Sequence, residues 1–322
     1  MKRISEYAAE VESAIRDLKI EDRKPESLYA PIAYAMEAGG KRLRPALTLM
    51  AAEAFGVPVE KSMPAALAME FFHNFTLLHD DVMDDSAMRR NRESVYKKFG
   101  KDAAILSGDT MEGIAQELLL SVDNPNLIAA LNVYNRMARE VYEGQALDME
   151  FENRSDVSPA EYLEMVRLKT GALLGACAEI GGILAGVDKK VLKGLHQYGE
   201  NLGIAFQIED DWLDTFGDAA TFGKPIGGDI NNGKKTFLLV SALSSGSQDA
   251  KALEVAMGLE AGEMRVKTVT RIYEKMEIGA LARKEAERFS TKAMHSIKST
   301  GLDEEHLENF KYLLDRLAGR RK

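Results

Sequence analysis

Residues 80–84 of this 322-residue chain read DDVMD, and residues 210–214 repeat the pattern as DDWLD. Positions i and i+4 share one face of an α-helix, so each pentapeptide places its first and last aspartates side by side. Exposed like charges at this spacing destabilise a helix by about 0.2–0.5 kcal/mol, and burial raises that cost. Both pentapeptides follow apolar sequence, which argues against two simple solvated acidic faces. Bound cations explain them better, and all-oxygen ligation suits Mg²⁺, which also shares phosphate oxygens.

Basic residues gather near both pentapeptides, as expected of a site for diphosphates. Arginine can bind phosphate through two parallel N–H groups, and lysine acts as a point charge. Taken singly, each is an ordinary surface charge, and only their placement favours phosphate binding. His73 precedes Asp80 by two helical turns on nearly the same face, although an isolated histidine beside phenylalanines is more often a core residue. The basic candidates are Lys41, Arg42, Arg44, Arg89, Arg90, Lys169, Lys224, Lys234 and Lys235.

Composition excludes several classes of protein. The net charge of −9 disfavours nucleic-acid binding, which needs a large positive field, so any anionic ligand requires a locally neutralised site. A single cysteine, Cys177, precludes an internal disulfide and indicates a reducing cytoplasm. The N-terminal residues carry charges throughout, so we expect no signal peptide. The most apolar segment, 170–187, contains Glu179 and predicts a buried helix rather than a membrane span.

Helical periodicity dominates the chain and predicts an all-α fold. Ser158, Pro159 and Glu161 form a typical helix start with a capping box, and an apolar stripe follows residues 307–317. We find no alternating pattern strong enough for a sheet and no linker that divides the chain. The one long irregular segment, 216–233, is of the kind that often carries function. We therefore expect a single domain, residues 1–322, of roughly ten or more helices around a common core.

Taken together and in order, these residues resemble the trans-isoprenyl diphosphate synthases, also called polyprenyl synthetases. The family usually has glycine after the paired arginines, where this chain has Asn91, a residue that tolerates the left-handed backbone of such a turn. The first motif also lacks the two-residue insertion of one bacterial subgroup. The matching segments are GKRLRP at 40–45, DDVMDDSAMRR at 80–90, GQ at 144–145 with Asp148, KT at 169–170, FQ at 206–207 before DDWLD, GK at 223–224 and GKKT at 233–236.

The resemblance implies packed helices around a central active-site cavity, usually in a homodimer, and a Mg²⁺-dependent prenyltransferase. Such an enzyme joins isopentenyl diphosphate head to tail to an allylic diphosphate of five to fifteen carbons. About three Mg²⁺ ions would hold the allylic diphosphate. The implied metal ligands are Asp80, Asp84 and Asp210, with Asp81 and Asp214 in the same motifs. The implied allylic contacts are Arg89, Lys169, Lys224 and Lys234, and the implied isopentenyl diphosphate contacts are Lys41, Arg44, His73 and Arg90.

The chemistry that the resemblance implies needs no nucleophilic side chain. Neutralising the diphosphate lets the allylic C–O bond ionise, and the double bond of isopentenyl diphosphate attacks the carbocation. The carbonyl of Lys169 or Thr170 and the side chain of Gln207 would supply negative dipoles to the cation. The proton that is then lost would pass to the released diphosphate, and Cys177 would be a core residue.

Chain length would be set on the helix before the first aspartate motif. Phe75 lies five residues, about 7.5 Å, before Asp80, and Phe72 lies about 12 Å before it. In the family, a bulky residue at the fifth position before the motif limits the product. With Phe75 there and the small Thr76 next, the pattern resembles that of enzymes making C20 geranylgeranyl diphosphate, with C15 farnesyl diphosphate the alternative. Alternatively, the phenylalanines are simply core residues.

Two other functions share part of this pattern. A class I terpene cyclase also uses DDxxD and Mg²⁺, but it needs neither a second DDxxD nor an isopentenyl diphosphate site. A non-catalytic partner subunit typically loses aspartates, and this chain keeps all six. The terminal residues Arg320, Arg321 and Lys322 either close over a diphosphate or form a solvated tail.

Overall fold

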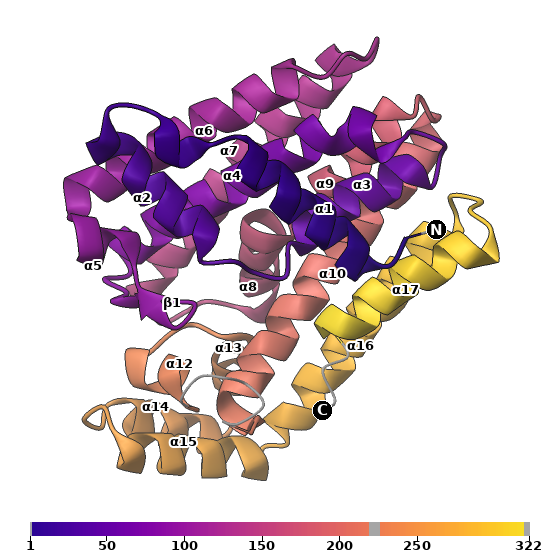
Figure 1. Ribbon diagram of the computed structural model, residues 1–322. Helices are drawn as coiled ribbons and strands as arrows, with labels where there is room; N and C mark the ends of the chain where they lie inside the picture. The colour runs from indigo at the N-terminus through magenta and orange to yellow at the C-terminus, as the bar shows by residue number, and fades with distance from the viewer. Residues whose placement is uncertain (1, 219–225, 319–322) are drawn as a thin grey trace. The chain divides into compact units, whose positions relative to one another are not determined.

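The computed structural model describes residues 2–218 and 226–318, and the regular structure of these residues is almost entirely helical (Figure 1). This confirms the predicted all-α fold. Outside the helices, the described residues form two short antiparallel strands, β1 (Met88–Arg89) and β2 (Arg92–Glu93). We did not predict this hairpin, because strands of two residues leave no alternating pattern in a sequence.

The helices begin and end as follows. The first group is α1 (Ile4–Asp17), the 3₁₀ turn η1 (Ile20–Asp22), α2 (Glu26–Glu37), α3 (Leu43–Glu53), α4 (Val59–Met83), α5 (Val95–Phe99), α6 (Lys101–Leu120) and α7 (Leu127–Glu152). The second group is α8 (Pro159–Val166), the π-helical turn η2 (Arg167–Gly171), α9 (Ala172–Leu184), α10 (Lys189–Phe216), α12 (Gly228–Asn232), α13 (Phe237–Ser244), α14 (Gln248–Met257), α15 (Glu263–Lys275), α16 (Ile278–Lys298) and α17 (Glu304–Ala318).

Two helix predictions are confirmed at the level of side chains. Ser158 caps α8, because its hydroxyl accepts the Glu161 N–H while the Glu161 carboxylate accepts the Ser158 N–H. The apolar stripe of the last helix lies in α17, where Phe310, Leu314 and Leu317 are buried.

The chain divides into two compact units, and it crosses from one to the other three times, each time within a helix. Unit 1 comprises residues 1–135 and 176–196, and unit 2 comprises 136–175 and 197–322. The single domain over residues 1–322 and its central cavity therefore stay predictions.

In unit 1, helix α4 forms the centre of the core and packs against α3 and α6. Its buried residues run almost without interruption from Ala65 to Phe75. The segment of α9 that belongs to this unit packs closely on α3, since a Cβ on Gly181 would lie 2.6 Å from the carbonyl oxygen of Thr48. Cys177 lies on the same segment and is fully buried with a free thiol, as expected of a core residue.

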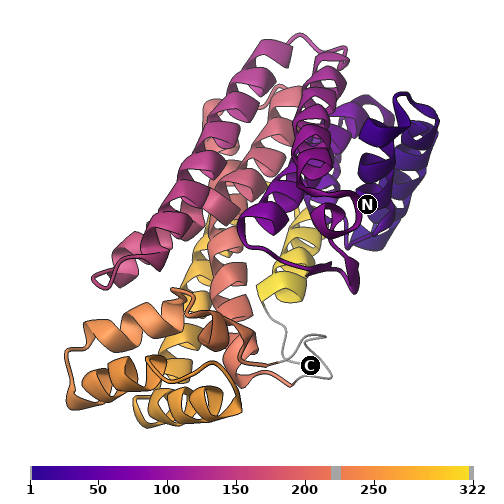
Figure 2. The ribbon, with the colours of Figure 1, turned by 90° about the vertical axis from the view of Figure 1, so that its left-hand side faces the viewer.

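In unit 2, helices α8, α13, α14, α15 and α16 enclose a second apolar core. Figure 2 shows α14 and α15 lying side by side, as their contacts also require. Helix α17 packs on α16, and Tyr198 donates a hydrogen bond of 2.6 Å to the Phe310 carbonyl.

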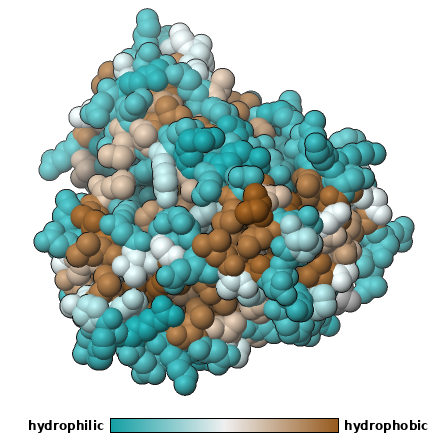
Figure 3. All heavy atoms as spheres, turned by 90° about the horizontal axis from the view of Figure 1, so that it is seen from above, coloured by the Kyte–Doolittle hydropathy of each residue, from teal (hydrophilic) through white to brown (hydrophobic). Residues whose placement is uncertain are grey.

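The surface is mixed in character. On the face seen in Figure 3, hydrophobic residues lie interspersed among hydrophilic ones. Among the described residues, no helix combines the length and the hydropathy that crossing a bilayer requires.

Candidate functional site

The basic turn between α2 and α3 takes its shape from left-handed backbone. Gly39 and Gly40 have φ of 68° and 142°, and Arg42, which caps α3, has φ of 45°. Glycine, which has no Cβ, adopts both of the first two conformations without steric strain. The turn leaves Lys41 exposed and places Arg44 in the first turn of α3.

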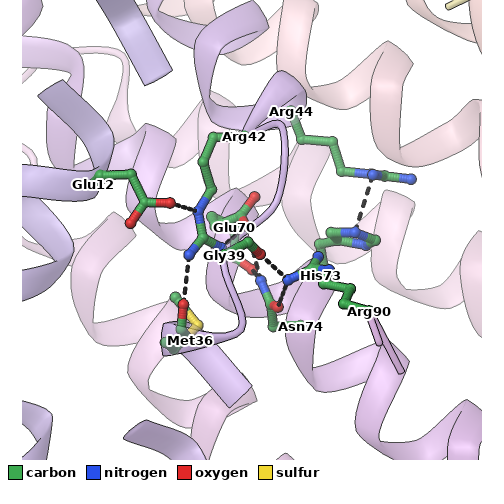
Figure 4. Close-up of polar contacts among 9 residues, drawn as sticks. All are labelled: Glu12, Met36, Gly39, Arg42, Arg44, Glu70, His73, Asn74 and Arg90. Atoms are coloured by element: carbon green, nitrogen blue, oxygen red, sulfur yellow. Dashed lines mark hydrogen bonds and ion pairs between the residues drawn. The ribbon is translucent and has the colours of Figure 1, made fainter. Parts of the chain in front are cut away.

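Arg44 and His73 lie together in unit 1, as predicted. The Nη1 atom of Arg44 is 3.0 Å from Nε2 of His73 (Figure 4). Because a guanidinium can only donate, Nε2 accepts, so the imidazole is neutral and carries its proton on Nδ1. The Nε–H of Arg44 is buried and has no acceptor among the described residues. A buried donor without an acceptor is costly, and an anionic ligand would satisfy it.

Burial lowers the pKa of His73 well below its usual value, and the positive charge of Arg44 lowers it further. We predict that the His73 ring stays neutral at pH 6, which ¹⁵N chemical shifts of labelled histidine would show. In the unfolded chain the His73 ring binds a proton below about pH 6.5, whereas in the folded protein it stays neutral there. The free energy of unfolding should therefore fall as the pH drops below about 6.5. A His73→Gln variant should lose that part of the dependence, and a ring that titrates in the folded protein near pH 6.5 would contradict the prediction.

Arg90 approaches the same turn from the β1–β2 hairpin. Arg90 and Asn91 have φ of 51° and 62°, so the expected left-handed turn at Asn91 is confirmed, and the pair matches a type I′ hairpin. The Arg90 guanidinium donates to the Gly39 carbonyl. It also lies against Gly40, since a Cβ added to Gly40 would be 3.1 Å from Cζ of Arg90. Neither Arg44 nor Arg90 forms an ion pair with a carboxylate in the described chain.

The first aspartate motif lies where α4 ends. Asp84 is the C-cap, and its N–H donates to the Asp80 carbonyl at 2.8 Å. Asp80 is partly exposed and Asp84 is exposed, whereas Asp81 is buried and forms an ion pair with Arg89, whose Nε lies 2.9 Å from Oδ1. Burial raises the pKa of Asp81. The sequence predicts a metal ligand at Asp81 and a diphosphate contact at Arg89, and in the structure these two side chains form an ion pair with each other.

The predicted chain-length residues lie in the unit 1 core before this motif. The Phe75 ring packs edge-on against Phe72 at 5.4 Å and against His79 at 4.8 Å between centroids. Phe72 also contacts Tyr134, and the Thr76 hydroxyl donates to the His73 carbonyl at 2.8 Å.

The second aspartate motif lies within α10 in unit 2. Asp211, which we had not singled out, is buried and accepts hydrogen bonds from the Tyr162 hydroxyl, the Phe237 N–H at 2.8 Å and the Gln207 amide at 3.1 Å. Burial raises its pKa to about 7. It therefore ties α10 to α8 and to the start of α13. The DDxxD motif does not reveal this role of Asp211, because sequence position alone does not distinguish a metal ligand from a buried aspartate that accepts hydrogen bonds from neighbouring helices.

Asp214 belongs to the same motif and also accepts hydrogen bonds. Its Oδ2 accepts the Asp229 N–H at 3.0 Å, and its carbonyl accepts the Gly227 N–H at 2.7 Å. Asp210, one turn before it, is partly exposed. The predicted Lys234 is exposed and its N–H donates to the Asp229 carbonyl at 3.0 Å. Lys224 lies outside the described residues, as do Arg320, Arg321 and Lys322.

Lys169 and Thr170 lie on the π-helical turn η2. The sequence placed Lys169 in the middle of a helix; the helix is continuous from α8 to α9, but it is wound more widely here. Such π-turns frequently mark functional sites. The Lys169 ammonium contacts the Asp148 carboxylate at 2.6 Å, which joins two of the quoted motifs.

Glycines let neighbouring helices of unit 2 approach this turn. A Cβ on Gly144 would lie 2.4 Å from the Lys169 backbone nitrogen. A Cβ on Gly203 would lie 2.7 Å from the Gly171 Cα and 3.1 Å from the Thr170 carbonyl oxygen. The backbone of η2 is thus held from α7 and from α10.

No group of three or more histidine, cysteine or acidic side chains in residues 2–218 and 226–318 is arranged to hold a metal ion by itself. The first and last aspartates of each motif instead form pairs one helical turn apart, Asp80 with the exposed Asp84 and the partly exposed Asp210 with the buried Asp214.

Comparison with known proteins decides the family. The family model for polyprenyl synthetase matches residues 25–276. The chain belongs to the polyprenyl synthetase family. It is therefore a prenyltransferase, as the motifs predicted. Among the relatives of this synthetase is the geranylgeranyl pyrophosphate synthase of Geoglobus acetivorans, 45% identical over 76% of each chain. Another is the (2E,6E)-farnesyl diphosphate synthase of Mycobacterium tuberculosis, 36% identical over 87% of this chain and 80% of that one.

Solved structures agree with this assignment. The synthetase superimposes on a crystal structure of a geranylgeranyl pyrophosphate synthase with a TM-score of 0.95 and 38% identity, covering 100% of both chains. The fold of that family is all-α, as here.

Proposed function

We propose that this protein catalyses the Mg²⁺-dependent head-to-tail condensation of isopentenyl diphosphate with allylic diphosphates and releases C20 geranylgeranyl diphosphate. One observation in the structure carries the proposal. Arg44 and Arg90, neither in an ion pair with a carboxylate, lie close to the neutral His73 on α4, the helix that ends in the first aspartate motif. Guanidinium groups that lie close together and outside ion-pair contact with a carboxylate favour a polyanionic substrate.

These residues would bind isopentenyl diphosphate. Arg44 would donate its buried Nε–H to a phosphate oxygen, and Arg90 would add a second guanidinium. His73, neutral with its proton on Nδ1, would donate one hydrogen bond without adding charge. Lys41, exposed beside them, would act as a point charge on the terminal phosphate.

The aspartate pairs fit Mg²⁺. Carboxylate oxygens are its usual protein ligands, and it completes its octahedron with water and phosphate oxygens rather than with an all-protein cage. Each motif places two carboxylates one helical turn apart, and Mg²⁺ is commonly bound by one or two carboxylates together with substrate phosphates. About three Mg²⁺ ions would neutralise the allylic diphosphate as a leaving group. The proposed ligands are Asp80, Asp84, Asp210, Asp81 and Asp214, and Arg89, Lys169, Lys224 and Lys234 would contact the same diphosphate.

Gln207 and the π-helical turn would stabilise the allylic carbocation. Because the Gln207 amide nitrogen donates to Asp211, its carbonyl oxygen is the end left to face the cation. The carbonyls of Lys169 and Thr170 would add negative dipoles from a backbone that close packing holds in place. The proton lost after attack would leave on the released diphosphate.

The proposed C20 product rests on the named relatives and on Phe75. The Geoglobus acetivorans protein is named for the C20 product and the Mycobacterium tuberculosis protein for the C15 product, so C15 is the alternative. We further propose that the protein acts as a homodimer in the cytoplasm.

Product analysis tests the proposal. Purified protein would be incubated with Mg²⁺, labelled isopentenyl diphosphate and each of the C5, C10 and C15 allylic diphosphates, and the dephosphorylated products sized by chromatography. We expect one C20 alcohol that disappears with chelator. Elongation that stops at C15 would select the alternative. A folded protein that extends no starter would refute the proposal and favour a cyclase or a non-catalytic partner subunit.

We predict that Phe75→Ala lengthens the product beyond C20. The change removes the ring that packs between Phe72 and His79 and would open the proposed floor of the cavity. The same chromatographic assay measures the effect. Phe71→Leu is the control, because Phe71 is also fully buried but is not at the fifth position before the motif. An unchanged product from folded Phe75→Ala would show that Phe75 is not the floor.

A further inference from the structure

Arg42, the middle basic residue of the turn between α2 and α3, has a fully buried side chain, whereas Lys41 beside it is exposed. Its guanidinium uses all three nitrogens inside the protein (Figure 4). Nε donates to Glu12 at 2.7 Å, Nη2 donates to the Met36 carbonyl at 2.6 Å, and Nη1 donates to Glu70. A guanidinium so enclosed has no face left for a substrate.

These bonds hold a backbone that would otherwise be unfavourable. Arg42 adopts a left-handed conformation, which is uncommon for a residue with a Cβ and persists only where the surroundings determine it. The partners of its side chain come from α1, α2 and α4. Arg42 therefore fixes the turn from which Arg44 projects.

Glu70 connects Arg42 to Arg90 through Asn74. The Asn74 amide nitrogen donates to the Glu70 carboxylate at 2.9 Å and to the Glu70 carbonyl at 2.8 Å. This orients the amide so that its oxygen faces Arg90 Nη1 at 3.5 Å, and Arg90 in turn donates to the Gly39 carbonyl of the turn (Figure 4). Both arginines that lack a carboxylate partner are thus positioned by contacts that lead back to Arg42 and Glu70.

We infer that Arg42 and Glu70 are positioning residues for the isopentenyl diphosphate site, an inference that rests on the proposed function. Two other roles predict different results. If Glu70 acted only as a counter-charge, its removal would leave the site more positive and tighten diphosphate binding. If the pair served only stability, folded variants would bind the substrate like the wild type.

The deciding variant replaces the pair together, as Arg42→Met with Glu70→Leu. Net charge is unchanged, and apolar replacement of a whole buried ion pair is often neutral for stability, whereas loss of one partner is not. We expect the KM for isopentenyl diphosphate to rise about tenfold, by analogy with the loss of affinity at metal sites when the residues that orient the metal ligands are removed. The KM for the allylic substrate should stay within about twofold of the wild type, the range of a neutral change.

Two single variants sharpen the test. Glu70→Gln keeps the shape and removes the charge, and we expect weaker binding of isopentenyl diphosphate. Glu12→Gln is the matched control, because Glu12 contacts Arg42 but has no contact with Asn74 or Arg90. We expect its KM for isopentenyl diphosphate to stay within about twofold of the wild type.

Calorimetric binding of inorganic diphosphate in EDTA supplies a readout besides activity. In the absence of metal, this affinity measures binding of diphosphate to the basic residues. We expect the double variant to bind diphosphate about tenfold more weakly. A wild type that binds diphosphate but extends no starter would refute the proposed function and leave this comparison intact. Wild-type KM and diphosphate affinity in the folded double variant would overturn the inference, as would tighter binding by Glu70→Gln.

Discussion

Replacing Asp80 by asparagine is expected to lower kcat/KM about a thousandfold, the loss typical when one group that stabilises developing charge is removed. Asp80 lies partly exposed one turn before Asp84, and the two carboxylates would hold the proposed Mg²⁺, which would neutralise charge on the diphosphate. An amide keeps the shape but removes the charge that holds the ion. Steady-state kinetics over a range of Mg²⁺ concentrations would measure both the loss and a higher Mg²⁺ requirement.

Asp85→Asn is the matched control. Asp85 is exposed next to the motif, has a left-handed backbone that asparagine also tolerates, and accepts a hydrogen bond from the Tyr96 hydroxyl that an amide oxygen can still accept. We expect its kcat/KM to stay within about twofold of the wild type. Equal losses in the two variants would mean that general negative charge, rather than a ligand at Asp80, supports the activity.

Gly144→Ala is expected to lower kcat about a hundredfold, the loss that a displacement of about 1 Å at an active site can cause. The new Cβ would lie 2.4 Å from the Lys169 backbone nitrogen, so the π-helical turn or α7 must move. The cost in unfolding free energy should be smaller, about 1–3 kcal/mol, as for other overpacked sites. Kinetics and urea unfolding on the same preparation would separate the two effects.

Gly113→Ala tests whether the loss is specific. Gly113 lies within α6, where an added Cβ meets no atom within 4 Å. Alanine in a helix interior should stabilise the protein by up to about 1 kcal/mol and leave kcat unchanged. A Gly144→Ala enzyme with wild-type kcat would show that the carbonyls of the π-helical turn do not take part in the reaction.

Much of the fold and the chemistry could be read from the sequence, because they depend on local pattern. Helical periodicity and the Ser158 cap depend only on residues that are close in sequence. The DDxxD motif with its flanking arginines indicates a diphosphate ligand bound with Mg²⁺. The β1–β2 hairpin could not be read in this way, although the left-handed turn at Asn91 could.

The partners of charged residues were the part that sequence could not supply. Asp81 and Asp211 look like Asp80 and Asp210 in the motif, yet one is paired with Arg89 and the other anchors Tyr162. Which carboxylate is buried depends on helices far away in the chain. Glu70 and Asn74 did leave a signal, since they are polar residues inside the apolar run of residues 65–78. Buried polar groups must find partners, so such residues predict a network even where its members are unknown.

The enclosed thiol of Cys177 has a practical consequence. Burial raises its pKa to about 12, so almost no reactive thiolate exists at neutral pH. Cysteines introduced at the exposed Ile128 of unit 1 and Val255 of unit 2 would then be the only thiols open to maleimide dyes. Because Cys177 would stay unlabelled, the protein is suited to fluorescence energy transfer between two introduced dyes. Such a measurement could follow the distance between the two units as substrates bind.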